Sequence, residues 1–87
     1  MAKRIPRHVK IATAAVVAFG DRGHSKLAEA AGISRQMMSF IVNGDKPVTD
    51  DVYRRVAGAL SKEADRMANA GRWLDKMALQ MLRELED

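Results

Sequence analysis

Residues 24–44 read H-S-K-L-A-E-A-A-G-I-S-R-Q-M-M-S-F-I-V-N-G, a stretch that predicts two short helices joined by a tight turn. Gly32 lies where the chain must turn, and a residue without a Cβ is favoured there because it adopts a positive φ without a clash. Ser34 is a good N-cap for the second helix, since its hydroxyl can accept a hydrogen bond from an amide of the first turn. Asn43 and Gly44 are typical of a helix C-terminus. The stretch therefore predicts a helix-turn-helix arrangement, with Ile33 filling the corner.

The second predicted helix has two different faces when its residues are placed about 100° apart. One face is apolar and is expected in the core: Met37, Met38, Ile41 and Val42. The other face carries Arg35, Gln36, Ser39, Phe40 and Asn43. Arg and Gln can bond bidentately to guanine and adenine edges in a DNA major groove, although any amphipathic helix also has a solvated polar face. The spacing of a small residue, a turn glycine and an apolar pair within one short window favours DNA recognition.

Three separated blocks, L-A-E-A-A-G-I-S-R (27–35), F-I-V-N-G (40–44) and V-A-G-A-L (56–60), resemble the Cro/C1-type (XRE-like) helix-turn-helix family of phage and bacterial regulators. The resemblance runs from about Gly23 to Leu60. It implies an all-α, five-helix, lambda-repressor-like domain, and it places base contacts on Arg35, Gln36, Ser39 and Phe40. DNA-backbone contacts are expected at His24, Asn43 and Lys46 by the same resemblance, together with the neighbouring Ser25 and Lys26.

Three positions depart from the family pattern. Val42 stands where many members have glutamate, and His24 stands where many have glutamine. A neutral histidine can still donate a hydrogen bond to a phosphate. Phe40 stands where a polar side chain is common, so it can contact a thymine methyl group, pack on another protein or cover the core.

Length and charge agree with this interpretation. A chain of 87 residues predicts one compact domain, which we place at residues 1–60, followed by a C-terminal dimerisation helix at residues 61–87. Residues 1–46 carry eight basic and three acidic side chains, a net charge of +5, whereas residues 47–87 carry a net charge of −1. A positive field over the half that contains the predicted recognition helix would attract phosphates and release counterions.

Other classes of function find little support in the sequence. No stretch approaches the ~20 apolar residues of a membrane helix. The run I-A-T-A-A-V-V-A-F (11–19) is similar to a signal-peptide core but has no clear cleavage site, so we expect a cytoplasmic protein without membrane contact. There is no cysteine, and His8 and His24 have no metal-type spacing. We therefore expect no enzyme activity, no cofactor and no metal.

Caps and apolar spacing predict the remaining helices. The first is expected to begin near Pro6 and to bury Val9, Ala12, Val16 and Phe19 before the glycines at 20 and 23 end it. The fourth is expected to begin after the N-cap Thr49, with Asp50 and Asp51 at the positive end of its dipole. It should bury Val52 or Tyr53, Val56 and Leu60.

Residues 61–87 predict a long fifth helix with one apolar stripe: Ala64, Met67, Ala70, Leu74, Met77, Ala78, Met81, Leu82 and Leu85. Gly71 could allow a bend, a close approach or a break. The stripe either folds back on the core or pairs with a second copy, and we favour a homodimer that presents two recognition helices about 34 Å apart. Its interface is expected at Ala70, Leu74, Met77, Ala78, Met81, Leu82 and Leu85, while Trp73 and Leu79 lie off the stripe and are expected to pack against a neighbour.

The N-terminal arm carries Lys3, Arg4 and Arg7, which are either solvated or bound to phosphates or a minor groove. The sequence as a whole predicts a sequence-specific transcriptional regulator that binds double-stranded DNA as a dimeric, autoregulating repressor. The alternative is an antitoxin-like or adaptor protein that binds a protein partner and contacts DNA only as a complex. Met37, Phe40 and Trp73 would suit such adaptable protein contacts.

Overall fold

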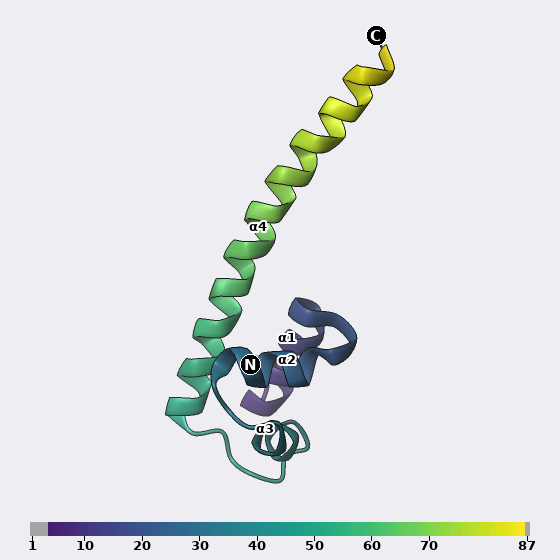
Figure 1. Cartoon of the computed structure of the whole chain (residues 1–87). Helices are drawn as coiled ribbons and strands as arrows, with labels where there is room; N and C mark the ends of the chain where they lie inside the picture. The colour runs from purple at the N-terminus through teal and green to yellow at the C-terminus, as the bar shows by residue number, and fades with distance from the viewer. Residues whose placement is uncertain (1–3, 87) are drawn as a thin grey trace.

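The computed structural model describes residues 4–86, which consist of helices and connecting turns without a strand. Four α-helices and one 3-10 turn follow one another: α1 (Arg7–Phe19), η1 (Gly20–Arg22), α2 (Gly23–Ala31), α3 (Arg35–Val42) and α4 (Asp50–Glu86). The first three helices and the beginning of α4 form a small body, and the rest of α4 projects from it as a rod (Figure 1). The all-α prediction is confirmed.

The prediction of five helices was wrong, because the expected fourth and fifth helices are one. Helix α4 runs for 37 residues from Asp50 to Glu86 and passes through both Gly58 and Gly71. An interior glycine costs a helix only about 1 kcal/mol relative to alanine, which a helix of many turns can absorb. Residues 57–64 contain no proline, and Ala59 and Glu63 continue the buried face of the helix. The boundary predicted after residue 60 therefore falls inside a continuous helix.

The core lies where α1, α2, α3 and the beginning of α4 meet. Its buried members are Ile11, Ala15, Leu27, Ala28, Ala31, Met38, Ile41, Val56 and Ala59. Met38 and Ile41 form the inner face of α3, as predicted, and Met37 and Val42 are half-buried beside them. Full burial of a side chain of this size contributes about 1.5–3 kcal/mol, so this contact fixes the orientation of α3 on the body.

Helix α1 buries a different face from the predicted one. Val9 and Val16 are 40% and 58% exposed, whereas Ile11 and Ala15 are buried. Every residue from 11 to 19 except Thr13 is apolar, so helical periodicity does not distinguish the faces. The packing of α2 determines which face of α1 is buried. Gly23, the first residue of α2, lies so close to α1 that an added Cβ would collide with the carbonyl oxygen of Ala15. This approach turns Ile11 and Ala15 inward.

The predicted helix caps are confirmed. The Ser34 Oγ accepts a hydrogen bond from the Met37 amide at 3.0 Å, and the Thr49 Oγ1 accepts one from the Val52 amide at 3.2 Å. Gly32 ends α2 in the left-handed conformation with φ 73°. After α3, Gly44 has φ 80° and the Asp45 amide donates to the Phe40 carbonyl oxygen at 2.8 Å. The bonds at Gly32 and Ser34 shape the link between α2 and α3, and those at Asp45 and Thr49 shape the link between α3 and α4.

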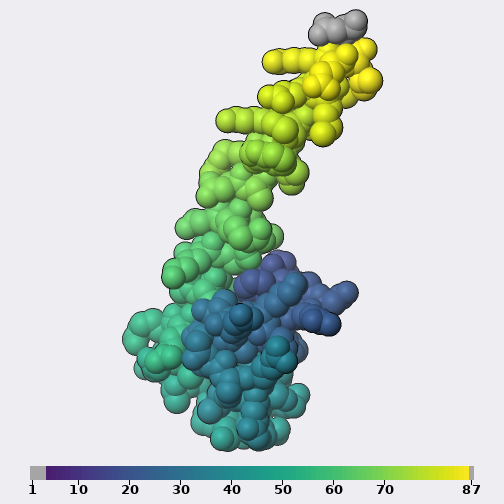
Figure 2. Space-filling model, in the orientation of Figure 1, coloured from purple at the N-terminus to yellow at the C-terminus, as the bar shows by residue number. Residues whose placement is uncertain are grey.

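The C-terminal part of α4 does not fold back on the body. It extends away from the body in the space-filling view as well (Figure 2). Its large apolar side chains are open to solvent. Leu74 is 60% exposed, Met81 is 62% exposed and Leu85 is 83% exposed. Trp73 and Leu79 are also more than half exposed. The interpretation in which this stripe covers its own core is therefore excluded.

Candidate nucleic-acid interface

Helices α2 and α3 are held together by three residues and a shared core. The link is Gly32–Ser34, in which the Ile33 amide donates to the Ala28 carbonyl oxygen at 3.0 Å and the Ile33 side chain is half-buried against the core. Leu27 of α2 is fully buried together with Met38 of α3. Because the inner faces of both helices are buried, the outer face of α3 is presented on a rigid support.

Most of the predicted base-contacting side chains lie on this outer face. Arg35, Gln36 and Ser39 are exposed on α3. Phe40 is half-buried, and the Lys46 ammonium lies 4.9 Å from the centre of its ring. A cation over an exposed ring contributes about 0.5–1 kcal/mol, so this pair holds the loop after α3 against the helix. Lys46, predicted to contact the DNA backbone, thus also has a partner within the chain.

A groove of about 280 Å³ brings together residues from both helices. His24 and Ser25 line it from the N-terminus of α2, and Arg35, Ser39 and Asn43 line it from α3. Met38 and Val42 complete its lining. Five of the nine residues predicted to contact bases or the DNA backbone therefore meet at one place, whereas Gln36, Lys26, Phe40 and Lys46 lie outside this groove.

The groove is suited to anionic groups. Its lining contains Arg35 but no aspartate or glutamate. The first turn of α2 also carries no acidic residue, and its N-cap residue, Arg22, makes no side-chain capping bond. The first amides of a helix point outward and carry the positive end of its dipole, which favours phosphate oxygens. Polar side chains of both helices therefore offer hydrogen-bond donors to the same surface.

The three basic residues predicted to form the N-terminal arm differ in their surroundings. Lys3 lies outside the described residues, and Arg4 is exposed. Arg7 instead joins the start of α1 to the start of α4: its Nη1 donates to Asp50 Oδ1 at 2.8 Å and to the Val48 carbonyl oxygen at 3.1 Å. Its guanidinium also lies 4.6 Å from the centre of the Tyr53 ring. Residue spacing could not reveal this contact, because the partners are more than 40 positions away.

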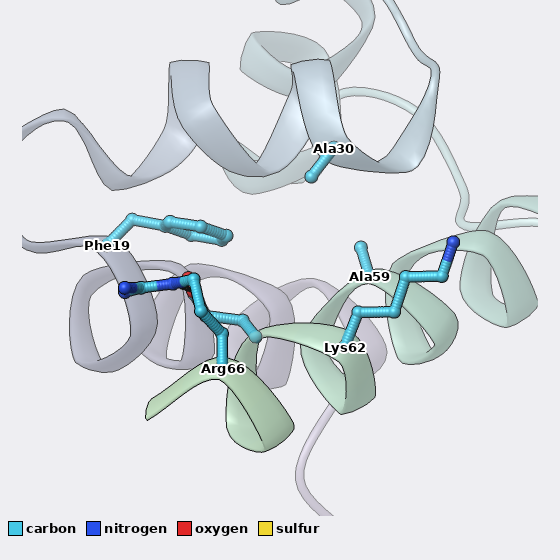
Figure 3. A pocket seen from close by; sticks show the side chains of 6 residues that line it. Phe19, Ala30, Ala59, Lys62 and Arg66 are labelled. Carbon is cyan, nitrogen blue, oxygen red and sulfur yellow. Dashed lines mark hydrogen bonds and ion pairs between the residues drawn. The ribbon is translucent and has the colours of Figure 1, made fainter. Parts of the chain in front are cut away.

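A second hollow of about 190 Å³ lies where α4 leaves the body, lined by Phe19, Ala30, Ala59, Lys62, Glu63 and Arg66 (Figure 3). The Glu63 carboxylate is buried and accepts hydrogen bonds from the Arg66 Nε. This bond and the nearby negative charge raise the pKa of the Arg66 guanidinium above its usual value. Sequence analysis did not single out Glu63, although it lies seven residues after the buried Val56 on the same helical face.

Residues 4–86 contain no cluster of three or more histidine or acidic side chains placed to hold a metal ion. None of the helices within these residues combines the length and apolarity needed to cross a membrane. Comparison with known proteins found no matching family model, no matching curated protein and no matching solved structure.

Proposed function

We propose that this chain is a sequence-specific DNA-binding transcriptional regulator of the Cro/C1 helix-turn-helix type. In this proposal α3 enters the major groove and the N-terminus of α2 rests on the phosphate backbone. The observation that carries the proposal is the acid-free groove that joins His24 and Ser25 of α2 to Arg35, Ser39 and Asn43 of α3. Phosphate-binding and base-binding groups must occupy one continuous surface if a single docking is to use both.

Base contacts are assigned to the exposed side of α3. A major groove admits one α-helix, and Arg35 and Gln36 at the start of α3 have the side chains suited to guanine and adenine. Ser39 lies one turn later and can bond to either base. Phe40 is placed at the edge of this surface, where the open part of its half-buried ring can contact a thymine methyl group.

Backbone contacts are assigned to the residues around this face. His24, Ser25 and Lys26 belong to the first turn of α2, whose amides can bind a phosphate. Asn43 and Lys46 follow α3 and would contact the adjacent strand. Lys3 and Arg4 would extend along the phosphates, whereas Arg7 is engaged with Asp50 and supports the body instead.

The proposal includes a homodimer that represses its own promoter. A single recognition helix contacts few base pairs, so a second copy is needed for useful specificity. The exposed apolar stripe of α4 supports such pairing, since large contiguous apolar surfaces on soluble proteins mark interaction sites. Repression needs only that the bound dimer occupies promoter DNA, which requires no further site on the protein.

The proposal is tested by titrating the protein against the DNA immediately upstream of its own gene and against a scrambled duplex of equal length, at two salt concentrations. We expect tighter binding to the upstream DNA at both, because base contacts are less sensitive to salt than phosphate contacts. Equal and strongly salt-dependent binding to both duplexes would contradict sequence-specific recognition. An Arg35→Ala variant should lose the preference, whereas Arg72→Ala, which removes the same charge from α4, should keep it.

A second candidate function is the adaptor or antitoxin-like protein. It is favoured by the valines on the outer face of α1, since Val16 and Val17 are 58% and 74% exposed. In that case the product of a neighbouring gene would bind α1, and DNA binding would require the complex. Co-expression with that product tests it: Val17→Asp should abolish complex formation, and the isolated chain should not bind the upstream DNA.

A further inference from the structure

The inward face of α4 continues beyond the body as an exposed apolar stripe. Val56, Ala59 and Glu63 are buried by α1 and α2. From Met67 onward the same face has apolar residues at alternating spacings of four and three: Met67, Ala70, Leu74, Met77 and Met81. This spacing is that of a two-helix coiled coil, in which such residues meet a second helix. The free part of α4 therefore has the pattern of a helix that is missing its partner.

Side-chain size along this free part is graded. On the apolar stripe, the small residues Ala64 and Ala70 lie in the first half beside Met67 and Leu74, and the large residues Met81, Leu82 and Leu85 lie in the second half beside Ala78. We propose that two copies of this chain pair through α4 in antiparallel orientation, so that the first half of each free part packs against the second half of the other. The inference rests on the dimer of the proposed function and adds its orientation and register.

The body limits the register of this pair. A register that keeps the paired segments on the free part of α4 places Leu74 opposite Met77, and Ala70 opposite Met81, of the second copy. A shift of one heptad toward the body would lay Glu86 over Gly58, beside Ala59, whose face is already covered by the chain's own helices. This register pairs Ala70 and Leu74 of each copy with Met81 and Met77 of the other.

Charge and volume both favour this orientation over the parallel one. In a parallel pair Glu84 would face Glu84 of the second copy, and Ala70 would face Ala70 across a gap that costs packing energy. In the antiparallel pair Glu84 lies opposite Met67 of the second copy and next to its Arg66. The Arg66 Nε is bonded to Glu63, and the terminal nitrogens of a guanidinium carry further N–H donors for a second carboxylate.

The antiparallel pair places the two bodies at opposite ends of the shared rod. At ~1.5 Å per residue, the two Asp50 residues would be separated by about 75 Å along the helix axis. This is about two turns of B-DNA at ~34 Å each, not one. The two half-sites recognised by one dimer should accordingly be farther apart than the single-turn spacing expected from the sequence.

Disulfide cross-linking tests the pairing directly, because the natural chain contains no cysteine. Full-length Ala70→Cys and Met81→Cys proteins are prepared separately and oxidised in a glutathione buffer, each alone and as an equimolar mixture. We expect the mixture to form a cross-linked heterodimer on a non-reducing gel, and each protein alone to remain uncross-linked. The matched control pair, Arg72→Cys with Arg83→Cys, lies on the outer face and should not cross-link in either condition.

Three results would overturn the inference. Cross-linking of each variant alone would indicate a parallel pair, and a monomeric mass in solution would exclude any pair. A dimeric mass without the heterodimer cross-link would exclude this register. Both substitutions lie outside the core, and circular dichroism confirms their helix content. DNA recognition is tested independently by titrating the wild-type protein against upstream and scrambled DNA. A failure of the α4 pairing can therefore be distinguished from a failure of DNA recognition.

Discussion

At the scale of single residues, two arginines of this chain have opposite surroundings. Arg35 is exposed on α3 with no acidic residue lining its groove, whereas Arg7 is bound by Asp50, Val48 and Tyr53. Both were predicted to contact DNA. The first remains available to a ligand, and the second stabilises the contact between the starts of α1 and α4.

Gln36→Ala should reduce the preference for the specific DNA site more than it reduces non-specific binding. A bidentate contact to adenine corresponds to about 1–3 kcal/mol of discrimination. The measurement is competition binding against specific and scrambled duplexes. Asn69→Ala, which removes an amide from the exposed surface of α4, serves as the control and should change neither affinity. Equal losses on the two duplexes would assign Gln36 to the DNA backbone.

Arg7→Ala should destabilise the fold, because it removes the bonds to Asp50 and Val48 and the contact with Tyr53. An exposed ion pair is worth about 0.2–1 kcal/mol and a cation–π contact about 0.5–1 kcal/mol, so we expect a loss of about 1 kcal/mol in the free energy of unfolding. Urea denaturation measures it. Arg4→Ala should leave this free energy unchanged and instead weaken binding to all duplexes alike; an unchanged stability of the Arg7 variant would argue against the structural role.

At the scale of elements, the close approach of α2 to α1 organises the body. Gly23 has a helical φ of −54°, which any residue can adopt, so a glycine is needed there because no room is left for a Cβ. Its nearest neighbour across the contact is the backbone of Ala15, which cannot move aside as a side chain could. This contact selects the buried face of α1 and leaves Val16 and Val17 outside.

Gly23→Ala should therefore destabilise the protein, by about 1–3 kcal/mol, the range observed when a packed core is overfilled. Gly58→Ala is the matched control: a Cβ there meets no atom within 4 Å in the described structure, and it should stabilise α4 by up to about 1 kcal/mol. Thermal unfolding followed by circular dichroism compares the two variants. Similar melting temperatures for both would contradict the close approach.

At the scale of the whole molecule, α4 has two roles in one continuous helix. Its beginning contributes Val56, Ala59 and Glu63 to the body, and its end carries an apolar stripe away from it. The molecule measures 60 × 35 × 20 Å, and the longest dimension follows this rod (Figure 1). Such a shape exposes more apolar surface than a monomer needs, and a second copy would cover it.

Truncation after Ala70 should leave the body folded but monomeric, because the buried core residues of the described chain all precede that position. We expect a native-like melting transition, a halved mass in solution and weaker binding to a two-half-site operator, with binding to a single half-site retained. Analytical ultracentrifugation and titration measure these quantities. A truncated protein that is still a dimer would place the interface elsewhere, for instance on the valines of α1.

The sequence alone determined the features that depend on neighbouring residues. The turn at Gly32, the caps at Ser34 and Thr49 and the two faces of α3 each involve bonds or spacings within one or two helical turns, so the residue types suffice to predict them. The tertiary structure alone decided which face of α1 is buried, which partners Arg7 has, and that α4 continues as a free rod. These depend on groups far apart in the sequence, whose proximity arises only when the helices pack.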